Sequence, residues 1–396
     1  MSDDFIFTSE SVTRGHPDKL CDQVSDAIVD HCLSLDSSAG INAECAVASG
    51  ILFISAHFAA KRGFSFPDVA RDVIRDIGYP TDIFDPDACA IMTSFMDHSA
   101  RDYRPLDLGA MSDSEIGRLT AKDQVTAFGY ACDQTGAMMP LPIWLAHGLA
   151  RRLDDPEVKR KLPELLPDAK TQVGVEYVAE EPSRIYSITL ETSQRDADKP
   201  DPAALRAALM EQVIEPVFAD ESLKPDGDTR LFINPEGPVV GGGPAVHSGL
   251  TGRKTGMDTY GEYARHSGSA LSGKDPMRID RIGAYAARWA AKNVVAAGLA
   301  RACEVQLSYS IGAAAPVSVR ARTFGSGSIA SPDIAKRLND SFDFRLGAIV
   351  RDLGLRLLPG EQPEGFYRRL ATYGHMGRVD LDLPWERLDR VDALKA

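Results

Sequence analysis

Basic side chains gather in one stretch of an otherwise acidic chain. Residues 251–281 carry six Lys or Arg against four Asp or Glu, whereas the whole chain has a formal net charge of −13. Residues 15–19, Gly-His-Pro-Asp-Lys, lie where a loop is expected to turn into a helix. The first turn of a helix attracts anions through its free N–H groups and its dipole. These two segments predict a site for a small, highly charged anion, with a solvated basic surface as the alternative.

Two segments imitate nucleotide-binding motifs. Residues 268–274 match the first seven positions of a P-loop, but Asp275 replaces the magnesium-binding Ser or Thr, and Pro276 follows. No apolar strand precedes this segment, so its context fails. Residues 325–330 imitate a dinucleotide fingerprint without a βαβ unit of the right length. Neither segment predicts a nucleotide site.

Bulk properties exclude several classes of function. An acidic chain is a poor non-specific binder of nucleic acid, because phosphate contacts need clustered Lys and Arg. No run of 18 apolar residues occurs, so no membrane span is expected. The first residues lack the basic and apolar regions of a signal peptide, and the six cysteines include no Cys-x-x-Cys pair. We therefore expect a cytoplasmic protein with reduced thiols.

Apolar periodicity predicts strands and helices mixed along the whole chain. A helix is expected to begin at Pro17, and further helices are expected over residues 68–77, 141–153, 202–218, 278–300 and 334–346. Strands are expected over residues 5–7, 173–177, 184–191, 305–310 and 317–323, with a polar stretch over 8–15 and a hairpin at 46–60 around Ser49-Gly50. Residues 98–120 have no period and are typical of a long mobile loop, the kind that forms lids. Three units are expected, at 1–110, 118–236 and 237–396.

Six separated groups of residues carry the most specific pattern. They are residues 8–19, Asp123-Gln124 with 128–131, residues 167–173, residues 249–254 with 257–261, residues 272–276 with 279–281, and residues 373–378. In this order they resemble the S-adenosylmethionine synthetase family. The resemblance runs nearly end to end and includes residues 286–288 and 291–300, which match the long helix of that family.

The resemblance implies a reaction in which a thioether sulfur attacks C5′ of ATP and the whole triphosphate leaves. The expected acceptor is L-methionine, and the products are S-adenosylmethionine, phosphate and diphosphate, formed through tripolyphosphate. The sulfur carries no proton, so the reaction needs no general base. It needs preorganised cations around the leaving group and alignment of sulfur, carbon and oxygen. Mg²⁺ and K⁺ are the implied cofactors.

The family's roles transfer to this chain residue by residue. The implied phosphate-binding, catalytic residues are His16, Lys170, Arg253, Lys254 and Lys274. The implied ATP-binding residues are Asp123, Asp168, Ser193, Val239 and Ala270. The implied residues around the sulfur acceptor are His57, His98, His247, Arg278 and Ile311. The implied metal ligands are Asp18 and Asp280 for Mg²⁺ and Glu44 for K⁺.

The resemblance also implies an α+β fold of three similar sheet-plus-helix units in a pseudo-threefold arrangement. The sheets would pack at a homodimer interface and share active sites across it, in a dimer or a tetramer. ATP and a small thioether are the expected partners.

The sequence departs from the family around the acceptor. Where the family has two acids and a glutamine, this chain has His57, His247 and His98, and Arg278 replaces a lysine. A neutral or cationic histidine binds an ammonium group less well than a carboxylate does. A thioether acid without an α-ammonium is therefore the alternative acceptor, and a non-catalytic nucleotide-binding or regulatory paralogue is a further alternative. The histidines lie on separate segments, which disfavours a metal site made of all three.

Overall fold

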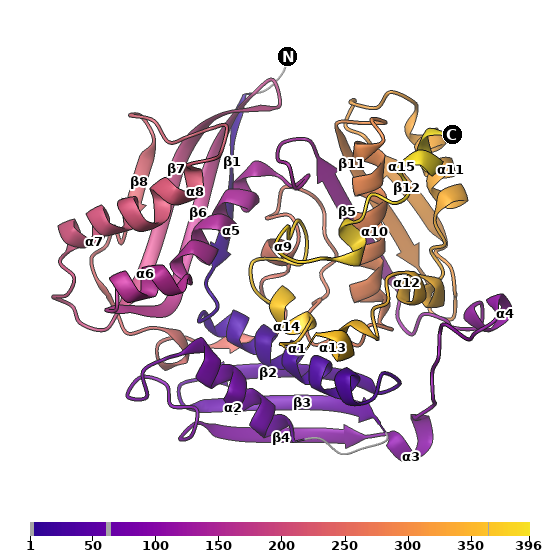
Figure 1. Ribbon diagram of the computed structural model, residues 1–396, viewed down its shortest axis with the longest axis horizontal. Helices are drawn as coiled ribbons and strands as arrows, with labels where there is room; N and C mark the ends of the chain where they lie inside the picture. The colour runs from indigo at the N-terminus through magenta and orange to yellow at the C-terminus, as the bar shows by residue number, and fades with distance from the viewer. Residues whose placement is uncertain (1–3, 61–64, 363) are drawn as a thin grey trace.

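The computed structural model describes residues 4–60, 65–362 and 364–396. Residues 1–3 and 61–64 of the expected unit 1–110, and residue 363 of the expected unit 237–396, therefore lie outside the described chain. These residues form three β-sheets, each covered by helices, around a central region built by the C-terminal segment (Figure 1). The fold is α+β, as expected. No helix among the described residues has both the length and the apolar character that a membrane span needs. All six cysteines are buried free thiols.

The first sheet combines β1, from the start of the chain, with strands from residues 165–240. Its order is β1-β6-β7-β8, with the short β9 also paired to β7. The strands are β1 (Phe5–Val12), β6 (Leu165–Val178), β7 (Glu181–Gln194), β8 (Arg230–Ile233) and β9 (Val239–Val240). Helices on one side of it, visible at the left of Figure 1, are α5 (Leu141–Leu153), α6 (Pro156–Lys161), α7 (Pro202–Leu209) and α8 (Glu215–Phe218), with a π-helical turn at Met210–Ile214 joining the last two.

The second sheet is formed by β10 (Gly249–Leu250), β2 (Gly40–Ala48), β3 (Ile51–Ala59) and β4 (Ala90–Asp97), in that order. It is packed by α1 (Pro17–Leu35) and α2 (Phe66–Ile77), which both lie on one face (Figure 1). Its other face exposes the large apolar side chains of Ile51, Phe53, Met92 and Met96.

The third sheet is formed by β12 (Ser318–Arg322), β11 (Ala302–Tyr309) and β5 (Val125–Cys132). The long helix α10 (Ile279–Ala296) packs on β5 and β11. Further helices of this part are α11 (Ser331–Ser341), α12 (Leu346–Asp352) and α15 (Val391–Lys395). The central region contains α9 (Thr255–Asp258), α13 (Leu358–Glu361), α14 (Tyr367–Leu370) and a 3-10 turn at Pro384–Glu386, and a further 3-10 turn, Gly243–Ala245, follows β9.

Several expected elements are confirmed, and others differ for identifiable reasons. The start of α1 at Pro17, the turn at Ser49-Gly50 and the bounds of α5 agree with the sequence pattern. The polar stretch after Phe7 instead continues as β1 to Val12, because its serines are buried with partners: Ser9 Oγ donates to the Gly261 carbonyl at 2.7 Å. Strands β4 and β5 were not expected. Strands β6 and β7 run further than predicted, and the long helix ends at Ala296.

Residues 98–120 are more structured than their composition indicates. They contain α3 (Ser99–Asp102) and α4 (Asp113–Ile116). Leu108 and Ile116 are buried, and Asp113 pairs with Arg345. A capping box at Ser112 and Glu115 begins α4. Two short helices with apolar anchors therefore replace the expected unstructured loop, while a lid function stays a prediction.

A row of four buried aspartates runs along one face of α1. Spaced four residues apart, they share a face of the helix, and each accepts a backbone N–H from a distant segment: Asp18 from Leu250, Asp22 from Gly252, Asp26 from Gly273, and Asp30 from Tyr367 and Arg368. Burial raises the pKa of Asp30 to about 7, although the hydrogen bonds from Arg368 and Tyr367 lower it. The row thus fastens three chain segments to α1.

Buried cations compensate the middle of this row. The Arg281 guanidinium lies 2.9 Å from Asp26, donates to the Lys274 carbonyl at 2.8 Å and stacks on Tyr367. The Lys19 ammonium lies 2.9 Å from Asp22 and also contacts Asp258. Removing one partner of such a pair leaves an uncompensated buried charge, which is strongly destabilising. The pairs therefore hold α1, α9 and the start of α10 in one arrangement.

We predict that Arg281→Met lowers the free energy of unfolding by about 3–5 kcal/mol, because it leaves the Asp26 carboxylate buried without its cation. Adding Asp26→Asn should recover part of this loss, since the amide keeps an acceptor for the Gly273 N–H and carries no charge. Urea unfolding followed by circular dichroism measures both.

Arg75→Met is the matched control. Arg75 pairs with Asp72 and Asp87 on the exposed side of α2, and exposed pairs contribute at most about 1 kcal/mol. Equal losses from the two arginine variants would contradict the role given to the buried pair.

Candidate active site

The N-terminus of α1 is held against the first sheet. Tyr79 Oη donates to the Gly15 carbonyl at 2.6 Å, and Gly15 N–H donates to the Pro167 carbonyl at 3.2 Å. His16 is the N-cap of α1: its Nδ1 accepts the Asp18 N–H at 3.2 Å. This brings the imidazole of His16, which is almost fully buried, beside the strand that carries Asp168.

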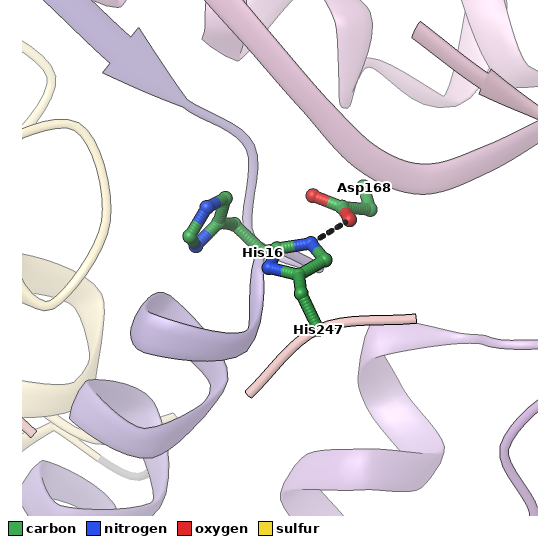
Figure 2. A group of neighbouring side chains, drawn as sticks. All are labelled: His16, Asp168 and His247. Atoms are coloured by element: carbon green, nitrogen blue, oxygen red, sulfur yellow. Dashed lines mark hydrogen bonds and ion pairs between the residues drawn. The ribbon is translucent and has the colours of Figure 1, made fainter. Parts of the chain in front are cut away.

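Asp168 is the centre of the polar contacts at this junction. Its Oδ2 accepts from His247 Nε2 and from the Gly243 N–H, both at 2.7 Å, and its backbone carbonyl accepts from Ser193 Oγ at 2.6 Å. The rings of His16 and His247 lie 5.0 Å apart between centroids, with their planes nearly perpendicular (Figure 2). Three segments that are far apart in the sequence therefore meet here. We call His16, Asp18, Asp168 and His247 the α1 junction.

Burial and charge set the protonation of this group. Burial lowers the pKa of His16 to about 4, a shift that the nearby Asp168 and Asp18 carboxylates oppose and Lys254 reinforces. His16 is therefore neutral at pH 7. Burial by itself would raise the pKa of Asp168, but the hydrogen bonds from His247 and from the Gly243 N–H hold that pKa below its ordinary value. Asp168 is therefore an anion.

The basic loop after β10 faces the same junction. Gly249 lies against the first turn of α1, where a Cβ atom would come within 2.2 Å of the Pro17 backbone. The loop brings the Arg253 guanidinium to 3.6 Å from Asp18 and Lys254 Nζ to 4.0 Å from the same carboxylate. Lys254 also lies 3.6 Å from Glu10. Both cations sit beside carboxylates and can be redirected to a bound anion.

Other predicted cations lie outside this group. Lys170 is half-exposed on β6 and pairs with Glu191 at 2.7 Å. Lys274 lies 3.1 Å from Asp280, whose carboxylate is buried in the first turn of α10. Arg278 pairs with Asp123 at 2.6 Å. Asp123, predicted to bind ATP, thus contacts Arg278, a residue expected at the acceptor.

A second group surrounds a cavity at the end of β3. The rings of His57 and His98 lie 6.0 Å apart. With Asn42, Lys122 and Arg278 they line a cavity of about 450 Å³, which we call the β3–β4 cavity. A carboxylate is also present, since Asp102 lines the same cavity and lies 3.9 Å from His98 Nδ1.

The structure divides the three histidines that replace family residues. His57 and His98 line the β3–β4 cavity, whereas His247 belongs to the α1 junction with Asp168. Within the described residues of one chain, the three histidines therefore fall into two separate groups. Ile311, expected near the acceptor, is exposed on the turn after β11.

The remaining predicted ATP-binding residues border the α1 junction. Val239 pairs with Ser193 where β9 joins β7. Ala270 lies against Gly252, next to the basic loop. Two contacts at the site were missed from the sequence, Tyr79 and Gly243. The glycine run at 241–243 was a visible signal, but Tyr79 had none, because its partner Gly15 is 64 residues away.

The predicted metal ligands fit a magnesium–phosphate complex. Mg²⁺ in proteins takes one or two carboxylates and completes its octahedral shell with water and substrate phosphates. Asp18 and Asp280 are buried carboxylates, each beside a cation that could also bind phosphate. Glu44, expected to bind K⁺, is exposed on the outward face of β2 opposite Ser55 and offers a single carboxylate.

Comparisons with known proteins find one family along nearly the whole chain. Sequence models of the N-terminal, central and C-terminal domains of S-adenosylmethionine synthetase match residues 4–100, 118–239 and 241–387. The chain is 46% identical to an S-adenosylmethionine synthase of Thermosynechococcus vestitus, with 99% of this chain and 97% of that protein covered. It is 45% identical to one of Acaryochloris marina, covering 99% and 96%, and 44% identical to one of Trichormus variabilis, covering 100% and 97%.

We predict that Gly243→Ala disturbs the α1 junction and lowers the free energy of unfolding by at least about 2 kcal/mol. Gly243 has a φ of +64°, and an added Cβ would lie 2.1 Å from Tyr79 Oη, the donor to Gly15. Urea unfolding measures the loss. Gly227→Ala is the control, because nothing lies within 4 Å of a Cβ there. If both variants are equally stable, Gly243 does not support the junction.

Proposed function

Because the chain belongs to the S-adenosylmethionine synthetase family, we propose that it transfers the adenosyl group of ATP to the sulfur of L-methionine. The products are S-adenosylmethionine, phosphate and diphosphate. The observation that carries this proposal is the α1 junction, where the basic loop brings Arg253 and Lys254 to the Asp18 carboxylate beside a buried, neutral His16.

The chemistry asks this chain's residues to hold charge and to fix geometry. As the C5′–oxygen bond breaks, negative charge grows on the bridging oxygen of the triphosphate. Arg253, Lys254 and Lys274 would turn from their carboxylate partners to the phosphates and stabilise that charge, and neutral His16 would donate one hydrogen bond. Mg²⁺, bound through Asp18 and Asp280, would neutralise further phosphate charge. The same cations would serve hydrolysis of the tripolyphosphate.

Asp168 would orient the nucleoside. Its Oδ2 is fixed by the Gly243 N–H, and Ser193 holds its backbone carbonyl, so the carboxylate is preorganised on β6. Fixing a reactant in a near-attack geometry can lower the barrier by roughly 7–11 kcal/mol. Lys170, Val239 and Ala270 would complete the proposed ATP site.

The acceptor site is proposed at the β3–β4 cavity. Arg278 would bind the methionine carboxylate, and a guanidinium can do so through two parallel hydrogen bonds. The loss of two family acids weakens the case for an α-ammonium group, but Asp102 lines the cavity and supplies a carboxylate. This favours methionine over a thioether acid without an ammonium group.

We also propose that two copies of the chain complete each site. The α1 junction and the β3–β4 cavity are built from different elements, and the outward face of the second sheet exposes a row of apolar side chains together with Glu44 and His57. Exposed apolar patches of this kind mark association surfaces. A homodimer or homotetramer formed on that face would bury the patch, with Glu44 as a K⁺ ligand. With six reduced thiols, the enzyme would act in the cytoplasm.

The reaction is tested by incubating the protein with ATP, Mg²⁺, K⁺ and methionine, and following the nucleotide products by mass spectrometry. We predict S-adenosylmethionine as the product. Lys274→Met should lower kcat/KM for ATP about 10²–10³-fold, because it removes one preorganised cation from the leaving group.

Lys336→Met, on the exposed side of α11, is the matched control and should keep its activity. ATP binding without turnover of methionine or any other thioether would replace the proposal by a nucleotide-binding or regulatory role. A sulfonium product formed only with another thioether would replace the acceptor alone.

The acceptor assignment makes a separate prediction. Asp102→Asn should raise KM for methionine roughly two- to fivefold, because an exposed carboxylate near the ammonium contributes modestly. His57→Glu, which adds a carboxylate to the same cavity, should lower that KM. A thioether acid without the α-ammonium serves as the comparison substrate, and its KM should not rise in Asp102→Asn. If KM for methionine is the same in all variants, the charge argument fails.

A further inference from the structure

The three side chains in Figure 2 have the ligand chemistry of a transition-metal site. We propose that His16, Asp168 and His247 bind a divalent cation of the zinc class, and that this ion and ATP exclude each other. The mutual exclusion of metal and ATP rests on the proposed function, in which His16 and Asp168 bind ATP. The metal site itself rests only on the geometry of the α1 junction.

The distances suit one ion. Each residue offers one ligand atom, and the three atoms lie within 4.8 Å of one another. Around tetrahedral zinc, with bonds of about 2.0–2.1 Å, ligand atoms lie roughly 3.3 Å apart, so each atom has to shift by only about 1 Å. His16 and Asp168 are buried and fixed, whereas His247 is half-buried on a loop and can make most of this adjustment. Figure 2 shows the His247 ring beside the Asp168 carboxylate and the His16 ring next to His247.

A buried oxygen at the site lacks a partner. Asp168 Oδ1 is buried and has no hydrogen-bond partner among the described residues, although its carboxylate is an anion. Leaving a buried charged oxygen unpaired is unfavourable. Oδ2, in contrast, is held by the Gly243 N–H. A metal at Oδ1 would satisfy the open oxygen while that N–H keeps the carboxylate oriented, as second contacts do at metal sites.

The donor set selects the class of metal. Two imidazoles and one carboxylate suit Zn²⁺, Co²⁺ or Ni²⁺, whereas Mg²⁺ prefers oxygen ligands throughout. Asp18 adds a second negative charge 3.8 Å from His16 and partly offsets the nearby Lys254 ammonium. Three protein ligands leave a coordination position open. The site therefore differs in chemistry from the proposed magnesium ligands Asp18 and Asp280.

Occupation of this site would inhibit the proposed reaction. An ion held between His16 and Asp168 takes the imidazole away from the phosphates and the carboxylate away from the nucleoside. We therefore expect inhibition that is competitive with ATP and reversed by a chelator. His247 completes the ligand set and is expected to contribute less to ATP binding than His16 and Asp168. The inhibition should therefore depend on His247.

The experiment uses the full-length protein after removal of metals, in excess Mg²⁺ and without substrates. Isothermal titration calorimetry with Zn²⁺ should give one site per chain. Co²⁺ should give the visible bands of a nitrogen–oxygen site without thiolate-to-metal charge transfer, because the buried cysteines are not ligands. His247→Ala should weaken zinc binding at least tenfold.

His57→Ala is the matched control, since it removes a histidine from the β3–β4 cavity and should leave zinc affinity unchanged. Asp168→Asn, checked for folding by circular dichroism, is a second variant that should also weaken binding. Zinc binding that survives both His247→Ala and Asp168→Asn, binding lost in His57→Ala, or thiolate charge-transfer bands would each overturn the site.

Enzyme kinetics test separately whether bound Zn²⁺ excludes ATP. In the wild type, Zn²⁺ should raise KM for ATP with kcat unchanged, and His247→Ala should lose this effect. If Zn²⁺ binds at the site but leaves KM for ATP unchanged, the exclusion is wrong. If zinc binds as expected and no S-adenosylmethionine forms without zinc, the metal site stands and the proposed function fails.

Discussion

The arrangement of this protein depends on the buried aspartate row of α1. Four carboxylates at four-residue spacing accept backbone N–H groups from β10 and the loop after it, from the loop before α10 and from α14. Buried carboxylates are unfavourable without partners, so Lys19, Arg281 and these N–H groups have to stay in place. The second sheet, the segment before α10 and α14 are therefore joined through one helix whose polar face is in the interior.

The same row links stability to function. The segments that it fastens are those that carry Arg253, Lys254 and Lys274, the cations expected to hold a triphosphate. Asp18, at the start of the row, belongs both to the fastening and to the proposed magnesium site. Rigid support of this kind keeps donors preorganised, which is where electrostatic catalysis gains most of its effect. Burying these charged groups costs free energy, and the resulting network holds the proposed triphosphate-binding residues in place.

The replaced histidines have two different consequences because they lie in two places. His57 and His98 change the β3–β4 cavity, where Asp102 and Arg278 keep both signs of charge available to an amino acid. His247 instead changes the α1 junction, where its Nε2 hydrogen-bonds Asp168. One set of substitutions therefore bears on the proposed acceptor site, and the other brings two imidazoles and a carboxylate together at the proposed ATP site.

The sequence by itself determined the family, the reaction class and the residues expected around the triphosphate, because these depend on residue types in short contiguous segments. It also determined α5 and the hairpin at Ser49-Gly50, where local periodicity and turn chemistry are enough. It did not reveal the second half of β1, since its serines resemble a polar loop until the fold supplies Gly261 as the partner of Ser9 and His147 as the partner of Ser11. Only the tertiary structure decided that the aspartates of α1 are buried, that Asp123 pairs with Arg278, and that His247 faces Asp168 and not His57. These contacts join residues from 79 to more than 300 positions apart, and a local pattern cannot specify which distant donor satisfies a buried carboxylate.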